Sequence, residues 1–206
     1  MKPEAVVFDI GNVLIHWDPI PVYDRLIGAE RRQALFDAVD LFEMNARVDL
    51  GAPIGDLVQA TATAHPDWHD EIMLWQKHWM DMATPAIERS VRLMKALQNN
   101  NIPVFSLTNF GIETYDLAAT HYPFFREFDR DFISGHLRMM KPDPAIYAHV
   151  EEISGVAPEA LIFTDDSPAN IAAATARGWQ THLFKGPAGW AKALVDAGLL
   201  TPEDTR

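Results

Sequence analysis

The first strand that the sequence predicts ends abruptly at a carboxylate. An apolar run over residues 6–8 is followed directly by Asp9, and the chain then passes through Gly11. Such a run, stopped by a polar residue and a glycine, is typical of a buried strand that leads into a turn. In open α/β sheets the carboxyl ends of buried strands carry the ligand site. Asp9 is therefore either a chemically active residue or an aspartate that merely caps a turn.

The composition limits the kinds of protein to which Asp9 can belong. The chain has 206 residues, 48% of them hydrophobic, which is enough for one large domain or for a main domain with an insertion. Without cysteine it has neither disulfides nor a thiolate metal site, which fits a reducing compartment. The formal net charge of −12 argues against a nucleic-acid or anionic-membrane surface, but not against a small anionic substrate held beside a metal.

Targeting and membrane segments are not expected. Residues 1–4 lead into the first strand without the apolar region of a signal peptide, and no later apolar run is long enough to span a bilayer. We therefore expect a cytoplasmic protein that binds neither nucleic acid nor membrane. The oligomeric state is not predicted.

From about residue 19 to residue 82 the pattern is helical, with no convincing strand. Three segments place apolar residues three and four apart: 30–39, 54–64 and 67–82. The last of them has four large apolar side chains on one face: Trp68, Ile72, Trp75 and Trp79. Such an aromatic face is more typical of core packing than of a cofactor site. We expect this region to form a helical subdomain.

Strands and helices alternate in the rest of the chain. The expected elements are a helix over 85–98, a strand over 103–107, a helix from 111, a short strand pair within 131–139, a helix opened by 141–144 and running to 153, a strand over 160–164, a helix over 168–177, a strand over 180–184 and a helix over 189–197. Alternation of this kind predicts parallel βαβ units with helices on both faces. The predicted fold class is α/β, a Rossmann-like doubly wound parallel sheet with an inserted helical subdomain.

Polar residues follow three of the predicted strands. Asp9, Thr108 and the pair Asp165 and Asp166 each stand directly after an apolar run. In a parallel sheet these residues gather at one edge, and Lys141, at the start of a helix, can reach the same edge. Taken singly, Asp165 could be a helix cap, Lys141 a turn residue and Thr108 an ordinary threonine. Their joint occurrence favours a site.

The charges of this set favour a metal. Asp9, Asp165 and Asp166 bring three negative charges into a confined place, where they repel one another unless cations are present. Lys141 supplies one positive charge and a divalent metal supplies two more. Hard carboxylate and carbonyl oxygens favour Mg²⁺, which takes substrate phosphate as a further ligand. We therefore expect Mg²⁺ and a small phosphorylated substrate at this edge.

Four segments, in order, resemble the motifs of the haloacid dehalogenase-like (HAD) hydrolase superfamily. They are residues 9–14 (DIGNVL), 106–109 (SLTN), 141–144 (KPDP) and 163–170 (FTDDSPAN). The resemblance implies a HAD-like core of residues 1–15 and 85–206, with residues 16–84 as a helical cap of the C1 type over the site. The Asp-x-Gly-Asn form of the first motif is similar to a branch that includes an α-D-glucose-1-phosphate phosphatase.

The resemblance also implies roles for the conspicuous residues. Asp9 is the expected nucleophile, which forms an aspartyl-phosphate, and Lys141 is expected to steady both the nucleophile and the phosphate. Thr108 and Asn109 are the expected substrate-binding residues. The expected metal ligands are Asp9, the backbone carbonyl of Gly11, Asp166 and, as a further ligand or supporting acid, Asp165. Covalent catalysis of this kind splits one difficult displacement into two easier ones.

The chain departs from the family pattern at Gly11. An aspartate two residues beyond the nucleophile commonly serves as general acid and base, and here that position is a glycine. Loss of a placed acid costs roughly a hundred- to ten-thousand-fold in rate. One explanation is a leaving group that needs little protonation, such as the anomeric oxygen of a sugar 1-phosphate. Another is that His16 or Asp18, just beyond the strand, takes its place.

Two further functions remain open. A 2-haloacid dehalogenase would use Asp9 to displace halide without a metal or a leaving-group proton, but Asp165 and Asp166 would then repel the carboxylate of the substrate. A non-catalytic protein would keep the pocket only to bind a phosphorylated ligand. A panel of phosphate esters and haloacids, run with Mg²⁺ and with chelator, separates these functions.

Other polar residues of the helical region carry weaker signals. Three of its histidines are spaced so that they do not share one helical face, and we do not expect them to bind a metal: His65, His69 and His78. The helical region should select the substrate by closing over Asp9. Near its entry we single out Trp17, Glu43 and Arg47, of which Arg47 could equally form a surface ion pair.

Overall fold

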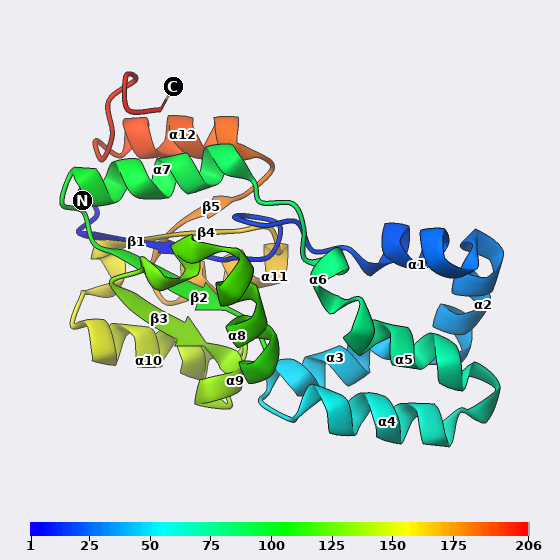
Figure 1. The fold of residues 1–206 in the computed structure, drawn as a ribbon. Helices are drawn as coiled ribbons and strands as arrows, with labels where there is room; N and C mark the ends of the chain where they lie inside the picture. Colours follow the sequence, from blue (N-terminus) through cyan, green and yellow to red (C-terminus); the bar gives the residue numbers. More distant parts are fainter. Residues whose placement is uncertain (206) are drawn as a thin grey trace.

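A central strand organises the chain. The structure is a computed structural model that describes residues 1–205. Five parallel strands form one sheet in the order β3-β2-β1-β4-β5 (Figure 1). Their bounds are β1 Ala5–Phe8, β2 Val104–Thr108, β3 Arg130–Ile133, β4 Leu161–Asp165 and β5 Gln180–Leu183. The predicted α/β fold with a doubly wound parallel sheet is confirmed.

Helices cover both faces of this sheet. The side chains of β1 alternate, so that Val6 and Phe8 pack on one face while Ala5 and Val7 pack on the other. The first face is covered by α7 Glu88–Asn99, α8 Ile112–His121 and α12 Pro187–Asp196. The second face is covered by α10 Pro144–Ser154 and α11 Pro168–Ala176. A strand buried on both sides has no polar face, which is why its sequence is continuously apolar.

Six helices form a separate helical layer beside the carboxyl edge of the sheet (Figure 1). They are α1 Pro19–Ile27, α2 Ala29–Ala38, α3 Leu41–Asp49, α4 Ile54–Ala64, α5 His69–Lys77 and α6 Trp79–Met82, with a 3₁₀ turn, η1, at Pro66–Trp68. The sequence missed α1 and α3, which are capped by the side chains of Asp18 and Asp40. The division into a core of 1–15 and 85–206 and a cap of 16–84 stays a prediction.

Trp75 is the centre of the helical layer. Its side chain is fully buried, and four aromatic rings have centroids within 6.5 Å of its own: Trp17, Tyr23, Phe36 and Phe42. Ile72 and Trp79 are also buried, whereas Trp68 is half-buried under the guanidinium of Arg31. The prediction that this aromatic face packs a core is confirmed for three of its four residues. The expected single helix over 67–82 is broken at His78.

Two predicted elements differ in the core. The helix expected from residue 85 begins at Glu88, because residues 85–87 pair instead with residues 14–16. The strand pair expected within 131–139 is the single strand β3 followed by the short helix α9 Ser134–Leu137. The chain turns after β3 because the Ser134 hydroxyl accepts a hydrogen bond from the Phe110 backbone and donates one to the Asp49 backbone.

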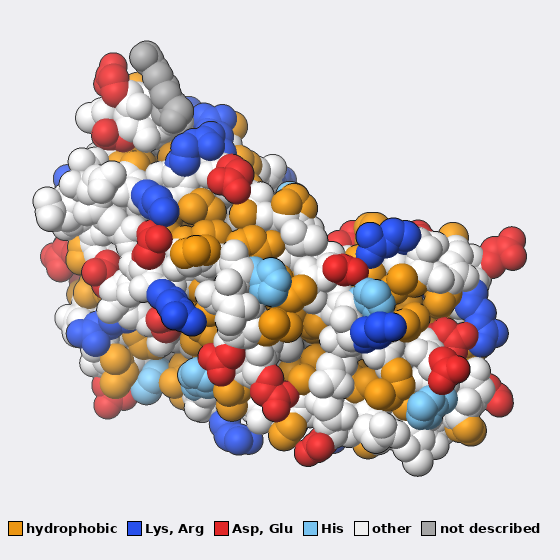
Figure 2. Space-filling model, viewed as in Figure 1, with side chains coloured by type: hydrophobic (Ala, Val, Ile, Leu, Met, Phe, Trp, Pro, Cys, Tyr) orange, Lys and Arg blue, Asp and Glu red, His pale blue; other side chains and the backbone are white. Residues whose placement is uncertain are grey.

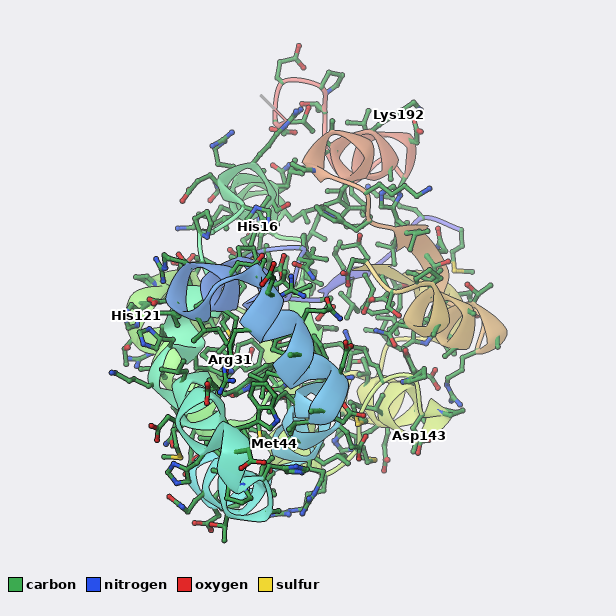
Figure 3. The ribbon with its side chains drawn as sticks, turned by 90° about the vertical axis from the view of Figure 1, so that its right-hand side faces the viewer. His16, Arg31, Met44, His121, Asp143 and Lys192 are labelled. Atoms are coloured by element: carbon green, nitrogen blue, oxygen red, sulfur yellow. The ribbon has the colours of Figure 1, made fainter. Side chains whose placement is uncertain are left out.

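Two chain segments connect the helical layer to the core, and they lie side by side. The His16 N–H donates to the Pro85 carbonyl at 2.9 Å, and the Ile87 N–H donates to the Leu14 carbonyl at 2.7 Å. Figure 3 views the molecule from the side of the helical layer, with Arg31 and Met44 on that layer and Lys192 on the core. The layer therefore lies across the edge of the sheet where the strands end.

On the face shown in Figure 2, charged side chains of both signs are scattered over both lobes, and apolar side chains lie between them. The excess of acidic residues is not gathered into a single patch on this face. None of the helices in residues 1–205 is long and apolar enough to cross a bilayer.

We predict that Trp75→Ala lowers the free energy of unfolding by about 3–5 kcal/mol, because it empties the centre of the helical layer. Trp68→Ala, which removes the half-buried tryptophan of the same aromatic face, is the matched control and should lower the free energy of unfolding clearly less. Urea denaturation, followed by circular dichroism, measures both variants. Equal losses would contradict the central role of Trp75.

Candidate active site

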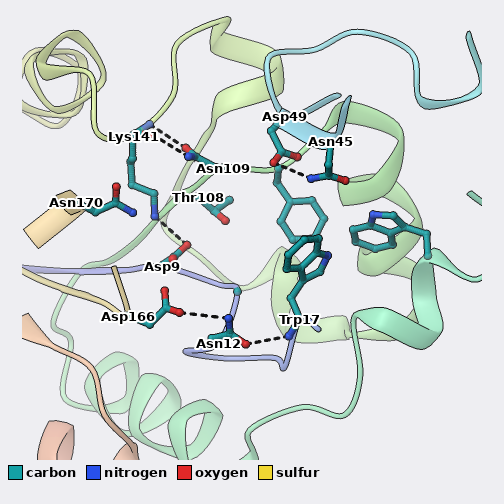
Figure 4. Close-up of a pocket in the computed structure, with 13 residues that line it drawn as sticks. Asp9, Asn12, Trp17, Asn45, Asp49, Thr108, Asn109, Lys141, Asp166 and Asn170 are labelled. Atoms are coloured by element: carbon teal, nitrogen blue, oxygen red, sulfur yellow. Dashed lines mark hydrogen bonds and ion pairs between the residues drawn. The ribbon is translucent and has the colours of Figure 1, made fainter. Parts of the chain in front are cut away.

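The carboxyl ends of three adjacent strands meet at one cavity. The register places Phe8 of β1 beside Ser106 of β2 and Thr164 of β4, so the residues that follow are neighbours. Six of the sequence-predicted site residues line a cavity of about 150 Å³ (Figure 4): Asp9, Gly11, Thr108, Asn109, Lys141 and Asp166. Asp165 does not line this cavity and is fully buried. The prediction that these residues gather at one edge is confirmed.

A buried lysine joins two of the carboxylates. Lys141 Nζ lies 2.9 Å from Asp9 Oδ1 and 2.6 Å from Asp165 Oδ2, and its side chain is 1% exposed. Burial lowers the pKa of Lys141, but the carboxylates of Asp9 and Asp165 outweigh burial and raise it above its usual value. Lys141 is therefore charged and holds Asp9 in place.

The surroundings of Asp9 disfavour the ionised form of its carboxyl group. The pKa of Asp9 is raised to about 7: burial raises it most, the charge of Lys141 lowers it, and the nearby carboxylates of Asp165 and Asp166 also raise it. A further cation at this point would favour the ionised form that a nucleophile needs.

Asp165 positions the lysine. Its Oδ2 accepts from Lys141 Nζ, and its Oδ1 accepts from the Ser167 backbone N–H at 2.7 Å. The side-chain amide of Asn170 donates to both oxygens at 3.0 Å. Each oxygen of this carboxylate is thus already hydrogen-bonded to the protein, which restricts where Lys141 can point.

Asn109 holds the main chain of Lys141. Its Nδ2 donates to the Lys141 carbonyl at 2.9 Å, and its Oδ1 accepts from the Lys141 N–H at 2.8 Å. This reciprocal pair ties the end of β2 to the segment before α10. The adjacent Thr108 is 1% exposed and faces the cavity, and among the described residues its hydroxyl makes no hydrogen bond. That hydroxyl is free to bind a ligand.

The acidic cluster fits a hard divalent cation. One carboxylate oxygen from each of Asp9, Asp165 and Asp166 lies within 4.8 Å of the others, and within residues 1–205 no other group of three or more acidic or histidine side chains comes so close. Partial burial and the charge of Asp165 raise the pKa of Asp166, although Asn12 donates a hydrogen bond to it. Carboxylate oxygens that repel one another in this way suit Mg²⁺.

Of the other residues singled out in the sequence, some line the cavity and some do not. Trp17 lines the cavity, and its N–H donates to Asn12 Oδ1. His16 is exposed (Figure 3) and Asp18 caps α1, and neither of these two expected substitutes for the acid at Gly11 lines the cavity. Glu43 and Arg47 lie at exposed positions of α3, away from the cavity. Within the described chain, three histidines of the helical layer are not part of a cluster of potential metal ligands: His65, His69 and His78.

The helical layer contributes side chains that the sequence prediction missed. Asn45 and Asp49 of α3 line the cavity together with Trp79 of α6 and Phe110 after β2. Asn45 and Asp49 lie four residues apart on α3, each directly after a buried apolar residue, Met44 or Val48. Two polar residues at helical spacing beside a buried apolar face are a pattern that the sequence already contained.

A family model described as haloacid dehalogenase-like hydrolase matches residues 3–178. The chain belongs to this family. The HAD-like fold and hydrolase class that the motifs implied are therefore confirmed, and the residue roles stay predictions.

Two curated relatives come from fungi. Drimenol cyclase drtB of Aspergillus calidoustus is 21% identical over 183 residues, and the match covers 87% of this chain but only 34% of the cyclase. Sesquiterpene phosphatase astK of Aspergillus oryzae is 26% identical over 191 residues, covering 85% of this chain and 86% of the phosphatase. This hydrolase thus spans about a third of the length of the first relative and most of the second.

Solved structures share the fold at low sequence identity. A HAD-like family hydrolase from Porphyromonas gingivalis has a TM-score of 0.74 and 21% identity, with 98% of this chain and 100% of that chain covered. HAD family enzyme bt-2542 from Bacteroides thetaiotaomicron, in complex with magnesium and inorganic phosphate, has a TM-score of 0.65 and 20% identity over 89% and 95% of the two chains. An L-2-haloacid dehalogenase has a TM-score of 0.65 and 20% identity, with 88% of this chain and 86% of that chain covered. These likenesses show the fold alone.

We predict that Lys141→Met lowers the free energy of unfolding by about 3–5 kcal/mol, because two buried carboxylates lose their partner. The loss should grow between pH 6 and pH 9. Lys141 lowers the pKa of Asp9 in the folded state, so its removal moves that pKa above about 7, and a raised folded-state pKa costs stability as the pH rises through it. Urea denaturation in chelator measures this, with the exposed Lys192→Met as control. A loss that is independent of pH would contradict the coupling between Lys141 and Asp9.

Proposed function

We propose that this hydrolase is an Mg²⁺-dependent phosphatase that acts on a small phosphorylated metabolite through an aspartyl-phosphate on Asp9. The observation that carries the proposal is the juxtaposition of Lys141, bound to Asp9, with a three-carboxylate cluster. A displacement that needs no metal gains nothing from Asp166, whose charge would repel an anionic substrate. With a divalent cation bound, the same cluster attracts a phosphate.

In the proposed reaction an oxygen of Asp9 attacks phosphorus, and the bond from phosphorus to the leaving-group oxygen breaks. Lys141 holds Asp9 and, together with the Thr108 hydroxyl, neutralises charge on the transferring phosphoryl oxygens. Water then attacks the phosphorus of the aspartyl-phosphate and releases inorganic phosphate. Asp9, Asp166 and the Gly11 carbonyl would hold Mg²⁺, which would supply further charge neutralisation on those oxygens.

Two relatives support phosphate chemistry. One curated relative is a sesquiterpene phosphatase, and one structural neighbour is a complex with magnesium and inorganic phosphate. The L-2-haloacid dehalogenase among the structural neighbours supports the second candidate, as does Gly11, because halide displacement needs no acid. The acidic cluster weighs against that candidate.

The helical layer is proposed to act as a C1-type cap that selects the substrate. The cavity of about 150 Å³ is smaller than the 300–1,000 Å³ or so of typical ligand pockets. It suits a phosphoryl group and the first atoms of its leaving group, and larger substrates require the cap to open. A sugar 1-phosphate, the substrate of one phosphatase of the Asp-x-Gly-Asn branch, has a leaving group whose oxygen is a weak base, so Gly11 is compatible with it.

We predict that Asp9→Asn abolishes the release of phosphate, by at least about a thousandfold, across a panel of phosphate esters that includes sugar 1-phosphates. The wild-type protein should require Mg²⁺ and lose activity in chelator. The exposed Asp196→Asn is the control. Full activity of Asp9→Asn, or release of chloride from 2-chloropropionate by the wild type in chelator, would overturn the proposal.

We predict that Asp166→Asn raises the dissociation constant of Mg²⁺ by at least about tenfold, because it removes a charged ligand from the cluster. Isothermal titration calorimetry measures the affinity without any assay of turnover. The thermal unfolding midpoint should stay close to that of the wild type, since Asp166 is exposed. Unchanged affinity for Mg²⁺ would place the metal elsewhere.

A further inference from the structure

We propose that Asp49, on α3 of the helical layer, is the general acid that serves this hydrolase in place of the aspartate missing at position 11. The inference rests on the proposed phosphatase function. It assigns the acid to the cap side of the cavity, across from the nucleophile. Catalysis is then divided between the core, which carries Asp9, and the helical layer, which carries the proton.

Asp49 lies on the wall of the cavity that faces the nucleophile. It lines the same cavity of about 150 Å³ as Asp9, Thr108 and Lys141. In Figure 4, Asp49 and Asn45 enter from the side of α3, whereas Asp9 and Asp166 lie on the opposite, core side. A phosphoryl group held beside Asp9 by the core thus points its leaving group toward the wall that carries Asp49.

A hydrogen-bonded chain orients the carboxyl group. The Trp75 Nε1–H donates to Asn45 Oδ1 at 3.1 Å, and Asn45 Nδ2 donates to Asp49 Oδ2 at 3.0 Å. Because the Asn45 oxygen is taken by the fully buried Trp75, the amide NH₂ must face Asp49. Asn45 thereby fixes Oδ2 of Asp49 and the plane of the carboxyl group at the wall of the cavity.

Close backbone contacts fix the end of α3 against the core. The Ser134 hydroxyl donates to the Asp49 carbonyl at 2.5 Å. A Cβ at Gly51 would lie 2.4 Å from the Gly135 carbonyl oxygen, and a Cβ at Gly111 would lie 2.5 Å from Val48 Cγ1. Only glycine permits these approaches, so the sequence keeps the main chain of Asp49 close to the catalytic edge.

The carboxyl group of Asp49 is suited to exchange a proton at neutral pH. Burial raises its pKa to about 7, although hydrogen bonds from the Gly111 backbone and from Asn45 favour the charged form. The other charged residues that line the cavity are Asp9, Lys141 and Asp166, all on the core side. An acid works best when its pKa lies near the operating pH.

Space for the missing acid remains at position 11. A Cβ on Gly11 would have no heavy atom within 4 Å, and the Gly11 backbone is not left-handed. The core therefore offers no substitute side chain there, and the Cβ of an introduced aspartate has open space on an ordinary backbone. Gly11→Asp is consequently a usable rescue variant.

The proton balance of the proposed step is complete. As Asp9 bonds to phosphorus and the phosphorus–oxygen bond to the leaving group breaks, neutral Asp49 gives its proton to the departing alkoxide, which leaves as an alcohol. Ionised Asp49 then takes a proton from the water that attacks the aspartyl-phosphate. Hydrogen phosphate leaves, and Asp9 regains its charge while Asp49 regains its proton.

The test compares leaving groups. Asp49→Asn should lower kcat/KM for alkyl phosphates by about a hundred- to ten-thousand-fold, because their alkoxides need a proton. For 2,4-dinitrophenyl phosphate, whose leaving group needs none, the loss should stay below about threefold on the same reasoning. Glu43→Gln, on the exposed side of the same helix, is the matched control and should change neither rate.

The rescue variant separates an acid from a merely structural role. The double variant Gly11→Asp with Asp49→Asn should cleave alkyl phosphates at least about tenfold faster than Asp49→Asn alone. Thermal unfolding of each variant shows whether it is folded.

Equal losses of Asp49→Asn on both substrate types, or no loss on alkyl phosphates, would overturn the inference. Failure of the rescue in a folded double variant would count against a proton-transfer role. If the wild type cleaves no phosphate ester, the proposed function fails first, and this outcome differs from an active enzyme that is indifferent to Asp49.

Discussion

The buried contact of Lys141 with Asp9 and Asp165 is the interaction on which the site depends. Three carboxylates and one ammonium leave two negative charges at the edge of the sheet. An apolar core tolerates such charges only when each is paired or hydrogen-bonded, and Ser167 and Asn170 supply such bonds to Asp165. The remaining negative charge creates the demand for a divalent cation. The same arrangement thus stabilises the fold and prepares a binding place for phosphate.

The parallel sheet explains why these charges meet. Strands that run in one direction bring their carboxyl ends to one edge, and the central β1 is flanked there by β2 and β4. Three strand ends and one segment before a helix are enough to build the nucleophile and the acidic cluster. The helical layer lies across this edge and closes the cavity with Asn45, Asp49 and Trp79. In the proposed mechanism, neither half of the molecule is sufficient alone.

Local sequence signals predicted the core well and the junctions poorly. The three central strands, β1, β2 and β4, are short and mainly apolar runs that end at polar residues, so their positions followed from pattern alone. Residues 85–87 were assigned to a helix because nothing local indicates that they pair with residues 14–16, some seventy positions away. The turn after β3 was missed for the same reason, since Ser134 bonds to Phe110 and Asp49. The helices α1 and α3 begin at capping aspartates, a local signal that the prediction did not use.

The sequence by itself determined the core half of the candidate site. Asp9, Thr108, Lys141 and Asp166 could be placed together because each belongs to an element whose direction the βαβ pattern dictates. Only the tertiary structure decided the other half. Asp49 lies forty residues from Asp9 on a helix of the inserted layer, and its position depends on glycine contacts between segments that are distant in the chain. Hydrophobic periodicity reports which face of a helix is buried, but not which other segment that face will meet.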